Sequence, residues 1–252
     1  MNAIYILWLR EVKKYSRSRV QIIASMGQPL LYLLVLGFGL GPVYQKAGGG
    51  SYLQFMAPGI VGMSVLFTSV FSGIALLWDR QFGFLKETLV APVARINVMI
   101  GRTLGGATVA MLQGTLIVVV CLIAGFRPVS LLGIPLGFAF MALIAIVFAA
   151  LGTSIGSSLQ DMQGFQLIMN FLVLPIFFLS GALFSLETAP RALKIVTAFD
   201  PLSYGVDGLR AALLTAETAQ THFGVGLDLA VLAVVAVILL GLGAWRFSKI
   251  EI

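Results

Sequence analysis

Six long and nearly uncharged apolar runs set the strongest limit on what this chain can fold into. They cover residues 22–40, 53–78, 98–125, 131–156, 165–184 and 227–245. A helix needs about 20 apolar residues to cross the hydrocarbon core of a bilayer. Membrane β-strands would instead be segments of about ten residues with alternating polarity, and no such alternation is found. We therefore expect an all-α integral membrane protein with six transmembrane helices, forming one domain over residues 1–252.

The composition excludes most classes of soluble protein. Only 10% of the residues are charged and the mean hydropathy is +1.02, whereas a soluble domain has about 25% charged residues. The formal net charge of +6 would suggest nucleic-acid binding in a soluble chain, but membrane proteins gather Lys and Arg on the cytosolic side. We expect no nucleic-acid partner. The single Cys121 and the single His222 exclude an internal disulfide and a histidine-based metal cluster.

The positions of Lys and Arg predict the orientation in the membrane. With the N-terminus inside, eleven basic residues fall in cytosolic segments and five in outer segments. The cytosolic set is Arg10, Lys13, Lys14, Arg17, Arg19, Arg80, Lys86, Arg95, Arg102, Arg246 and Lys249; the outer set is Lys46, Arg127, Arg191, Lys194 and Arg210. Both termini are therefore expected in the cytosol. The first run is too long for a cleavable signal.

Residues 1–20 predict an amphipathic helix lying at the membrane interface. Its basic residues are spaced as one helical stripe, which consists of Arg10, Lys13, Lys14 and Arg17. Its apolar and aromatic residues form a stripe almost opposite, which consists of Ile4, Trp8, Val12 and Tyr15. We expect the aromatic rings at headgroup depth and the cations toward anionic lipid or a protein partner. The alternative is a plain charge cluster that only sets the topology.

Small residues recur at helical spacing, as in Gly101-x-x-x-Gly105 and Gly152-x-x-x-Gly156. Such spacing lets two helices approach closely. Because glycine is common in membrane helices, we expect these residues to serve packing within the chain.

The segment 79–95, DRQFGFLKETLVAPVAR, is expected to join the second and third spans in the cytosol. Phe82, Leu85 and Leu89 are spaced so that a short helix would have one apolar edge. Pro92 disfavours helix at the residue before it and so ends the segment. An exposed apolar edge marks either a partner site or a contact with the membrane surface, and the pattern alone favours neither.

Two motifs resemble the membrane subunits of ABC transporters of the ABC-2 type. Segment 79–95, preceded by YLQFMAPGIVGMSVL at 52–66, is similar to the corresponding part of daunorubicin-type drug exporters and nodulation lipo-oligosaccharide exporters. LSGALFSLETAPRALKIVTAFDPLSYGVDGLRAAL at 179–213 resembles the family's second motif, which combines a Leu-Ser-Gly turn with Pro, Asp/Asn-Pro-Leu-x-Tyr and Arg. One departure is Phe184-Ser185, where the family often has Phe-Pro. The resemblance covers essentially the whole chain and implies an ABC-2 exporter-type fold.

The resemblance implies that segment 79–95 contains a coupling helix, which seats in a groove of a cytosolic ATPase. The residues implied to make this contact are Arg80, Phe82, Phe84, Leu85, Lys86, Glu87 and Leu89. The resemblance also implies the bacterial plasma (inner) membrane as location and a second permease copy as partner, besides membrane lipid. The chain has no G-x-x-x-x-G-K-[ST] loop, so it is not expected to be an enzyme itself. ATP and Mg would bind to the partner ATPase, and we expect no cofactor on this chain.

Family members dimerise with spans two and five facing a central route, which implies a set of pathway residues. The set is Ser64, Phe67, Thr68, Phe71, Asn170, Phe171, Phe177 and Phe178. Aromatic rings with scattered hydroxyl groups suit an amphiphilic cargo such as a drug, lipid or glycolipid. The alternative is that these rings pack against lipid or neighbouring helices.

The segment 187–226 is long for a simple connection and suits two short helices that enter the outer leaflet and return. A loop lying on the surface is the alternative. The resemblance implies re-entrant helices that cap the exit. The candidate cap residues are Pro190, Asp200, Pro201, Tyr204, Asp207 and Arg210, of which the polar ones would satisfy backbone groups at the break.

Two other functions are alternatives to export by a permease subunit. The first is an ATP-independent carrier or channel; a carrier coupled to protons would bury acidic residues near mid-membrane, whereas Asp161 and Asp228 are expected at span ends. A membrane-embedded enzyme needs grouped polar residues, and we assign no catalytic residue and no metal ligand. The expected function is ATP-driven export of a hydrophobic molecule by a separate motor acting on this chain.

Overall fold

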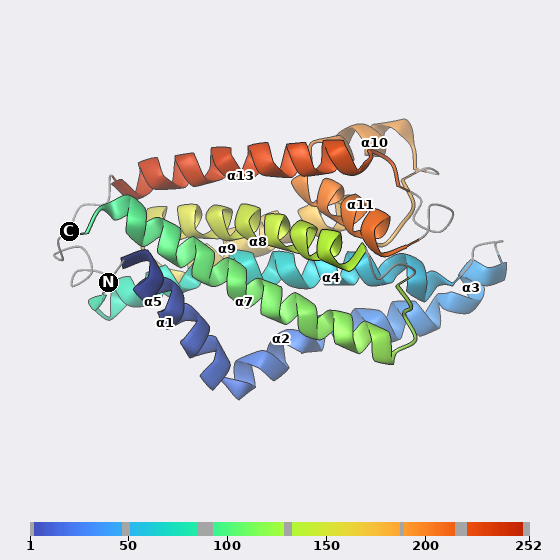
Figure 1. The fold of residues 1–252 in the computed structure, drawn as a ribbon, viewed down its shortest axis with the longest axis horizontal. Helices are drawn as coiled ribbons and strands as arrows, with labels where there is room; N and C mark the ends of the chain where they lie inside the picture. The colour runs from blue at the N-terminus through green and yellow to red at the C-terminus, as the bar shows by residue number, and fades with distance from the viewer. Residues whose placement is uncertain are drawn as a thin grey trace.

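The computed structural model describes residues 3–46, 51–84, 93–128, 133–186, 189–214 and 221–248. Over these ranges the chain forms helices and no strand. The helices are α1 (Ala3–Arg17), α2 (Arg19–Tyr32), the π-helix η1 (Leu33–Phe38), α3 (Gly41–Lys46), α4 (Tyr52–Phe71), α5 (Ile74–Gln81), α7 (Arg95–Ile123), α8 (Gly133–Ser158), α9 (Met162–Leu179), α10 (Arg191–Ala198), α11 (Pro201–Leu213) and α13 (Val225–Ser248). They form an elongated bundle (Figure 1).

Six helical segments among the described residues are long and apolar enough to cross a membrane. They are Arg19–Lys46, Tyr52–Gln81, Arg95–Ile123, Gly133–Ser158, Met162–Leu179 and Val225–Phe247. Each overlaps one of the six apolar runs of the sequence, so the expected all-helical membrane fold is confirmed. The first segment combines α2, η1 and α3, and the second combines α4 and α5.

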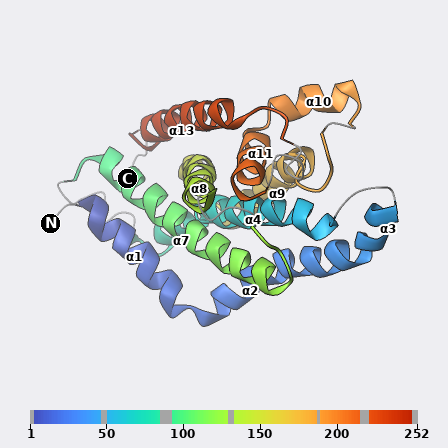
Figure 2. The same cartoon turned by 45° about the vertical axis from the view of Figure 1, so that its right-hand side comes forward.

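The α4 and α8 helices lie in the middle of the bundle and contact each other, α7 and α11. Figure 2 shows α13 and α10 on one side of these central helices and α1 with α2 on the other. The start of α1 and the end of α13 lie at the same end of the bundle as α5, whereas α3, α10 and α11 lie toward the opposite end (Figure 1). An even number of spans among the described residues accounts for the start of α1 and the end of α13 sharing one end.

The second span is a broken helix, because α4 ends at Phe71 and α5 begins at Ile74. Ser72 ends α4, and its hydroxyl donates to the carbonyl oxygen of Ser69 at 2.6 Å. A side chain at Gly73 would overlap the Gly152 carbonyl oxygen of α8. The break therefore lies where the backbones of the second and fourth spans touch.

The paired glycines lie at helix crossings, as the sequence predicted. A methyl group at Gly105 of α7 would lie 2.8 Å from Cβ of Glu11 in α1. One at Gly152 of α8 would overlap the Val70 carbonyl oxygen of α4. Because both contacts are made within one chain, the prediction that these glycines serve internal packing is confirmed.

Candidate functional site

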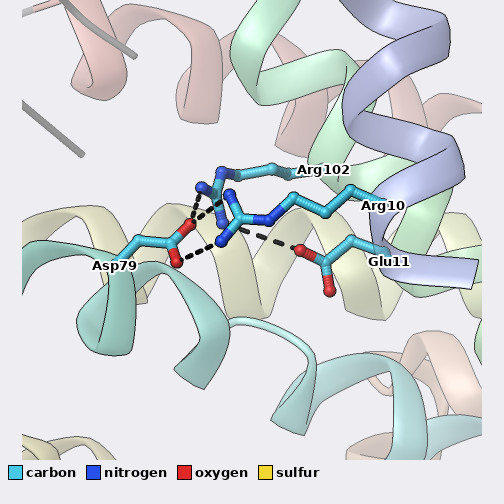
Figure 3. A network of polar contacts seen from close by, with 4 residues as sticks. All are labelled: Arg10, Glu11, Asp79 and Arg102. Carbon is cyan, nitrogen blue, oxygen red and sulfur yellow. Dashed lines mark hydrogen bonds and ion pairs between the residues drawn. The ribbon is translucent and has the colours of Figure 1, made fainter. Parts of the chain in front are cut away.

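A buried ion-pair network joins α1, α5 and α7 at the end of the bundle near the termini (Figure 3). Asp79 of α5 accepts from both terminal nitrogens of Arg10, at 2.7 and 3.0 Å, and from Nη2 of Arg102. Nη1 of Arg102 lies 3.9 Å from Oε1 of Glu11. The side chains of Asp79 and Arg102 are 8% and 5% exposed, and that of Arg10 is 41% exposed. We call these four residues the charge junction.

The fit of α1 against α7 places the charge junction. Gly101 and Gly105 leave room for the α1 backbone on either side of Arg102. Further along the same seam, Nε1 of Trp8 donates to Oγ1 of Thr108 at 2.9 Å. Tyr15 is buried and its hydroxyl bonds to the Gln113 side chain. The two aromatic residues therefore anchor α1 to α7 along its length.

This contact changes the interpretation of the N-terminal helix. Trp8 and Tyr15, whose rings we expect at headgroup depth, also bond to α7, whose small residues provide a close-fitting surface. Arg10, expected to face lipid or a partner, binds Asp79. The remaining cations of the predicted stripe, Lys13, Lys14 and Arg17, are exposed.

Arg80, the residue after Asp79, joins α5 to the C-terminal end of α8. Its Nη1 donates to the Leu159 carbonyl oxygen at 2.6 Å, and its Nη2 lies 3.5 Å from the Ser157 carbonyl oxygen. A cation is favoured there because the last carbonyl groups of a helix lack partners within the helix. We expected Arg80 at the rim of an ATPase pocket, but the structure places its guanidinium group on this chain. Its contact fixes α5 from a second side.

The predicted boundary and helical edge of segment 79–95 need correction. Asp79 lies inside α5 and is buried, not in a loop, because two arginines hold it between helices. Phe82 ends α5, and Gly83 has φ of +80°, a left-handed conformation that breaks a helix. Phe82 therefore does not share one continuous helix with later residues. Leu85, Lys86, Glu87 and Leu89 lie outside the described residues.

Phe82 and Phe84 are exposed beside the charge junction. Their exposed fractions are 63% and 50%. Phe82 stacks on Trp78 of α5, with ring centroids 5.5 Å apart, and the Arg10 guanidinium lies 5.9 Å from the centre of the Phe84 ring. Two aromatic rings are thus presented at the surface from a helix end that is fixed internally.

The predicted pathway residues fall into two groups. Ser64, Phe67, Thr68 and Phe71 of α4 line a cavity of about 680 Å³ beside α1 and α2. The four predicted residues of α9 do not line it. Among them Phe177 is buried, with edge contacts to Phe67 and Tyr32, whereas Asn170, Phe171 and Phe178 are exposed on the outer side of α9. Among the described residues, a ring contact between Phe67 and Phe177 joins the two groups.

Two short helices, α10 and α11, occupy the predicted cap segment at the opposite end. Pro190 precedes α10, and Asp200 with Pro201 begins α11. Asp200 accepts from the Leu202 N–H group at 2.9 Å, which caps α11. Burial raises the pKa of the Asp200 carboxyl group to about 7, against the lowering effect of its hydrogen bonds. The cap helix α11 is buried among α4, α8 and α13.

The other cap residues satisfy backbone groups that helices leave unpaired. The Tyr204 hydroxyl donates to the Ala198 carbonyl oxygen at 2.8 Å, at the end of α10. The Asp207 carboxylate accepts from the backbone N–H groups of His222 and Phe223 at 2.9 to 3.0 Å, just before α13. Asp207 therefore holds the start of the sixth span to α11.

Arg210 is the central connection at this end. Its Nη2 donates to the Gly181 and Ala182 carbonyl oxygens at 2.8 and 3.1 Å, and its guanidinium lies 3.9 Å from the centre of the Phe55 ring. Burial lowers the pKa of Arg210 to about 10, and the nearby Asp207 raises it. The group therefore stays charged at neutral pH.

We expect Arg210→Lys to destabilise the protein by about 2 kcal/mol, because a lysine cannot keep the planar two-point contact while stacking on Phe55. Thermal unfolding of the purified protein in detergent measures the effect. Arg127→Lys is the control, since Arg127 is exposed and its guanidinium donates to the carbonyl oxygens of Leu122 and Phe126, which lie close to it in the chain. Equal stability of the two variants would contradict this role of Arg210.

Sequence reasoning missed the partners in the charge junction. The sequence pattern predicts only that Arg102 lies on the cytosolic side and that Asp79 lies in a cytosolic loop. It predicts no role for Glu11. A usable signal was present, because Arg102 lies inside a long apolar run, where a charged residue needs a partner. The sequence does not show which carboxylate is that partner.

Six helices long and apolar enough to cross a bilayer are the mark of a multi-pass membrane protein. The family description "ABC-2 type transporter" matches residues 2–214, so the chain belongs to the ABC-2 type transporter family. Nodulation protein J of Rhizobium leguminosarum bv. viciae is 27% identical over 87% of this chain and 86% of its own length. Nodulation protein J of Rhizobium meliloti (strain 1021) is 29% identical over 87% of this chain and 84% of its own length. The ycf38 protein of Porphyra purpurea, which is described as a transport permease, is 31% identical over 77% of this chain and 68% of its own length. The chain is therefore a membrane transport permease.

Proposed function

We propose that this chain is the membrane subunit of an ATP-driven exporter. Cytosolic ABC ATPase subunits bind ATP and Mg, and two copies of the permease form the route for a hydrophobic drug-like molecule, lipid or glycolipid. The movement is outward from the cytosolic side of a bacterial plasma membrane. Membership of the family supports transport by a permease. The contacts of α5 with other helices support a mechanism in which a separate ATPase drives the permease.

The observation that carries this proposal is the attachment of α5. Asp79 joins α5 to α1 and α7, and Arg80 joins it to the end of α8. Phe82 and Phe84 follow directly and are exposed. A force applied by a partner at these rings reaches three other helices through charged contacts. Aromatic residues, phenylalanine among them, are also enriched in the buried cores of protein interfaces.

The distribution of charge supports a cytosolic position for the α5 end. Exposed basic residues occur in α1 and at the start of α2, namely Lys13, Lys14, Arg17 and Arg19, and α1 is joined to α5 by the Arg10–Asp79 ion pair. This agrees with the preference of Lys and Arg for the cytosolic side. The chain ends near α5 would then also be cytosolic, and α10 and α11 would lie toward the outside.

We expect Phe82→Asp to weaken ATPase association by about tenfold or more, because it places a charge where an aromatic ring would be buried. The test co-expresses the chain with ABC ATPases from neighbouring reading frames and measures co-purification and ATP-dependent transport in liposomes. Phe199→Asp is the matched control, since Phe199 is 84% exposed and follows α10 at the other end.

Persistence of both association and transport in Phe82→Asp would make the proposal wrong. Liposomes holding the chain without an ATPase provide a further comparison. Cargo movement in these liposomes, driven by an ion gradient alone, would instead show an ATP-independent carrier or channel.

A further inference from the structure

The cavity beside α4 has two chemically different walls. Met63, Phe67, Phe71 and Ile74 supply apolar surface from the second span. Gln21, Ser25 and Gln28 of α2 face the same space, and Lys14 of α1 lies at its border. A volume of about 680 Å³ is within the range of cavities that hold drug-sized ligands. The combination suits a molecule with one apolar and one polar part.

One polar group in this cavity lacks a partner. Ser64 is 2% exposed and its hydroxyl makes no hydrogen bond to any described residue. A buried hydroxyl without a partner is unfavourable, because it has lost its hydrogen bonds to water and gained none in the protein. A ligand in the cavity could supply the missing hydrogen bond, so Ser64 indicates a binding site and not merely a packing gap.

The charges at the cavity border favour an anionic ligand. Glu11 and Lys14 are the charged residues that line it. Glu11 already faces Arg102 in the charge junction, which contains two cations and two carboxylates. Lys14 is exposed, and no ion pair to it occurs among the described residues. The cavity border therefore carries one uncompensated positive charge.

We propose that this cavity binds an amphiphile with a negatively charged headgroup. The headgroup lies at Lys14 and the neighbouring amide side chains of α2, and the apolar part lies against Phe67 and Phe71. The role of this amphiphile as cargo rests on the proposed transport function, but its binding to the chain does not. A free amphiphile and an anionic bilayer lipid share this chemistry.

Trp78 lines the cavity and provides a direct test. Trp8→Phe with Trp245→Phe leaves Trp78 as the only tryptophan, because the chain has three. The probe is 9,10-dibromostearate, whose bromine atoms quench tryptophan fluorescence on contact, added to protein in phosphatidylcholine nanodiscs. The methyl ester of the same acid is the uncharged comparison. Neither measurement needs an ATPase or transport, so failure here is distinct from failure of the proposed function.

We expect saturable quenching by the anionic probe and about tenfold weaker binding after Lys14→Gln, because a charge-assisted contact is lost. Lys13→Gln is the matched control: it removes the same charge from the adjacent exposed position, which does not line the cavity. Ala24→Phe, which fills the cavity from α2, should also weaken binding.

Equal quenching by acid and ester, or equal loss of binding in the two lysine variants, would overturn the proposal, as would unchanged binding in Ala24→Phe. Adding phosphatidylglycerol to the nanodiscs separates the two sources of ligand. Displacement of the probe assigns the site to an anionic bilayer lipid, and retention assigns it to a free amphiphile. Both results support an anionic headgroup site.

Discussion

Replacing Asp79 by alanine is expected to lower the free energy of unfolding by about 3–5 kcal/mol. The substitution leaves the Arg102 guanidinium, 5% exposed, without the carboxylate that offsets its charge. Breaking a buried ion pair from one side is costly because the remaining charge is still removed from water. Arg10, at 41% exposed, can turn toward water and so contributes less of the loss.

The single cysteine provides the measurement. Cys121 is 0% exposed and lies in α7, so a thiol-reactive dye labels it only when the bundle opens. Labelling followed against temperature gives the unfolding midpoint in detergent. Arg10→Met, which removes the exposed partner of the same carboxylate, should cost only about 1 kcal/mol.

A double variant separates the charge from the packing. Asp79→Leu combined with Arg102→Met replaces the buried pair by apolar side chains of similar size. We expect at least half of the lost stability to return, since apolar replacement of a buried ion pair is often neutral. If Asp79→Ala unfolds at the same temperature as the wild-type protein, the charge junction does not hold α5 against α7.

The second large effect is expected for Gly152→Ala, a loss of about 3 kcal/mol, at the upper part of the range for overpacking. The added methyl group would overlap the backbone of Val70, and a backbone carbonyl cannot rotate away as a side chain can. The α4 and α8 helices must then separate along the crossing that also contains Gly73. The ion pairs of Asp79 in α5 with Arg10 and Arg102 should weaken when α4 and α8 separate.

Gly241→Ala is the matched control, with the opposite sign. Gly241 lies inside α13, and a methyl group there would meet nothing within 4 Å. Alanine is a better helix former than glycine, so this variant should be more stable by about 0.5–1 kcal/mol. The same Cys121 labelling measures both variants. Equal destabilisation by the two substitutions would show that loss of glycine as such, and not the crossing, is responsible.

The helical class and the six crossings follow from the sequence because they depend on local properties. Length and apolarity of each run determine whether a segment can cross a bilayer. The same applies to the amphipathic N-terminal helix and to the pair of short helices near Asp200. The break between α4 and α5 was not predicted, since Ser72 and Gly73 form it only together with the backbone of α8.

The sequence by itself determined the membrane class, the number of crossings, and the glycine spacing that permits close packing. Only the tertiary structure decided which charges meet. Asp79 and Arg102 are separated along the chain, and whether Asp79 lies in water or between helices depends on where α1 and α5 pack on α7. A charge in an apolar run shows that a partner is needed, but the partner is chosen by three-dimensional proximity, which no local pattern encodes.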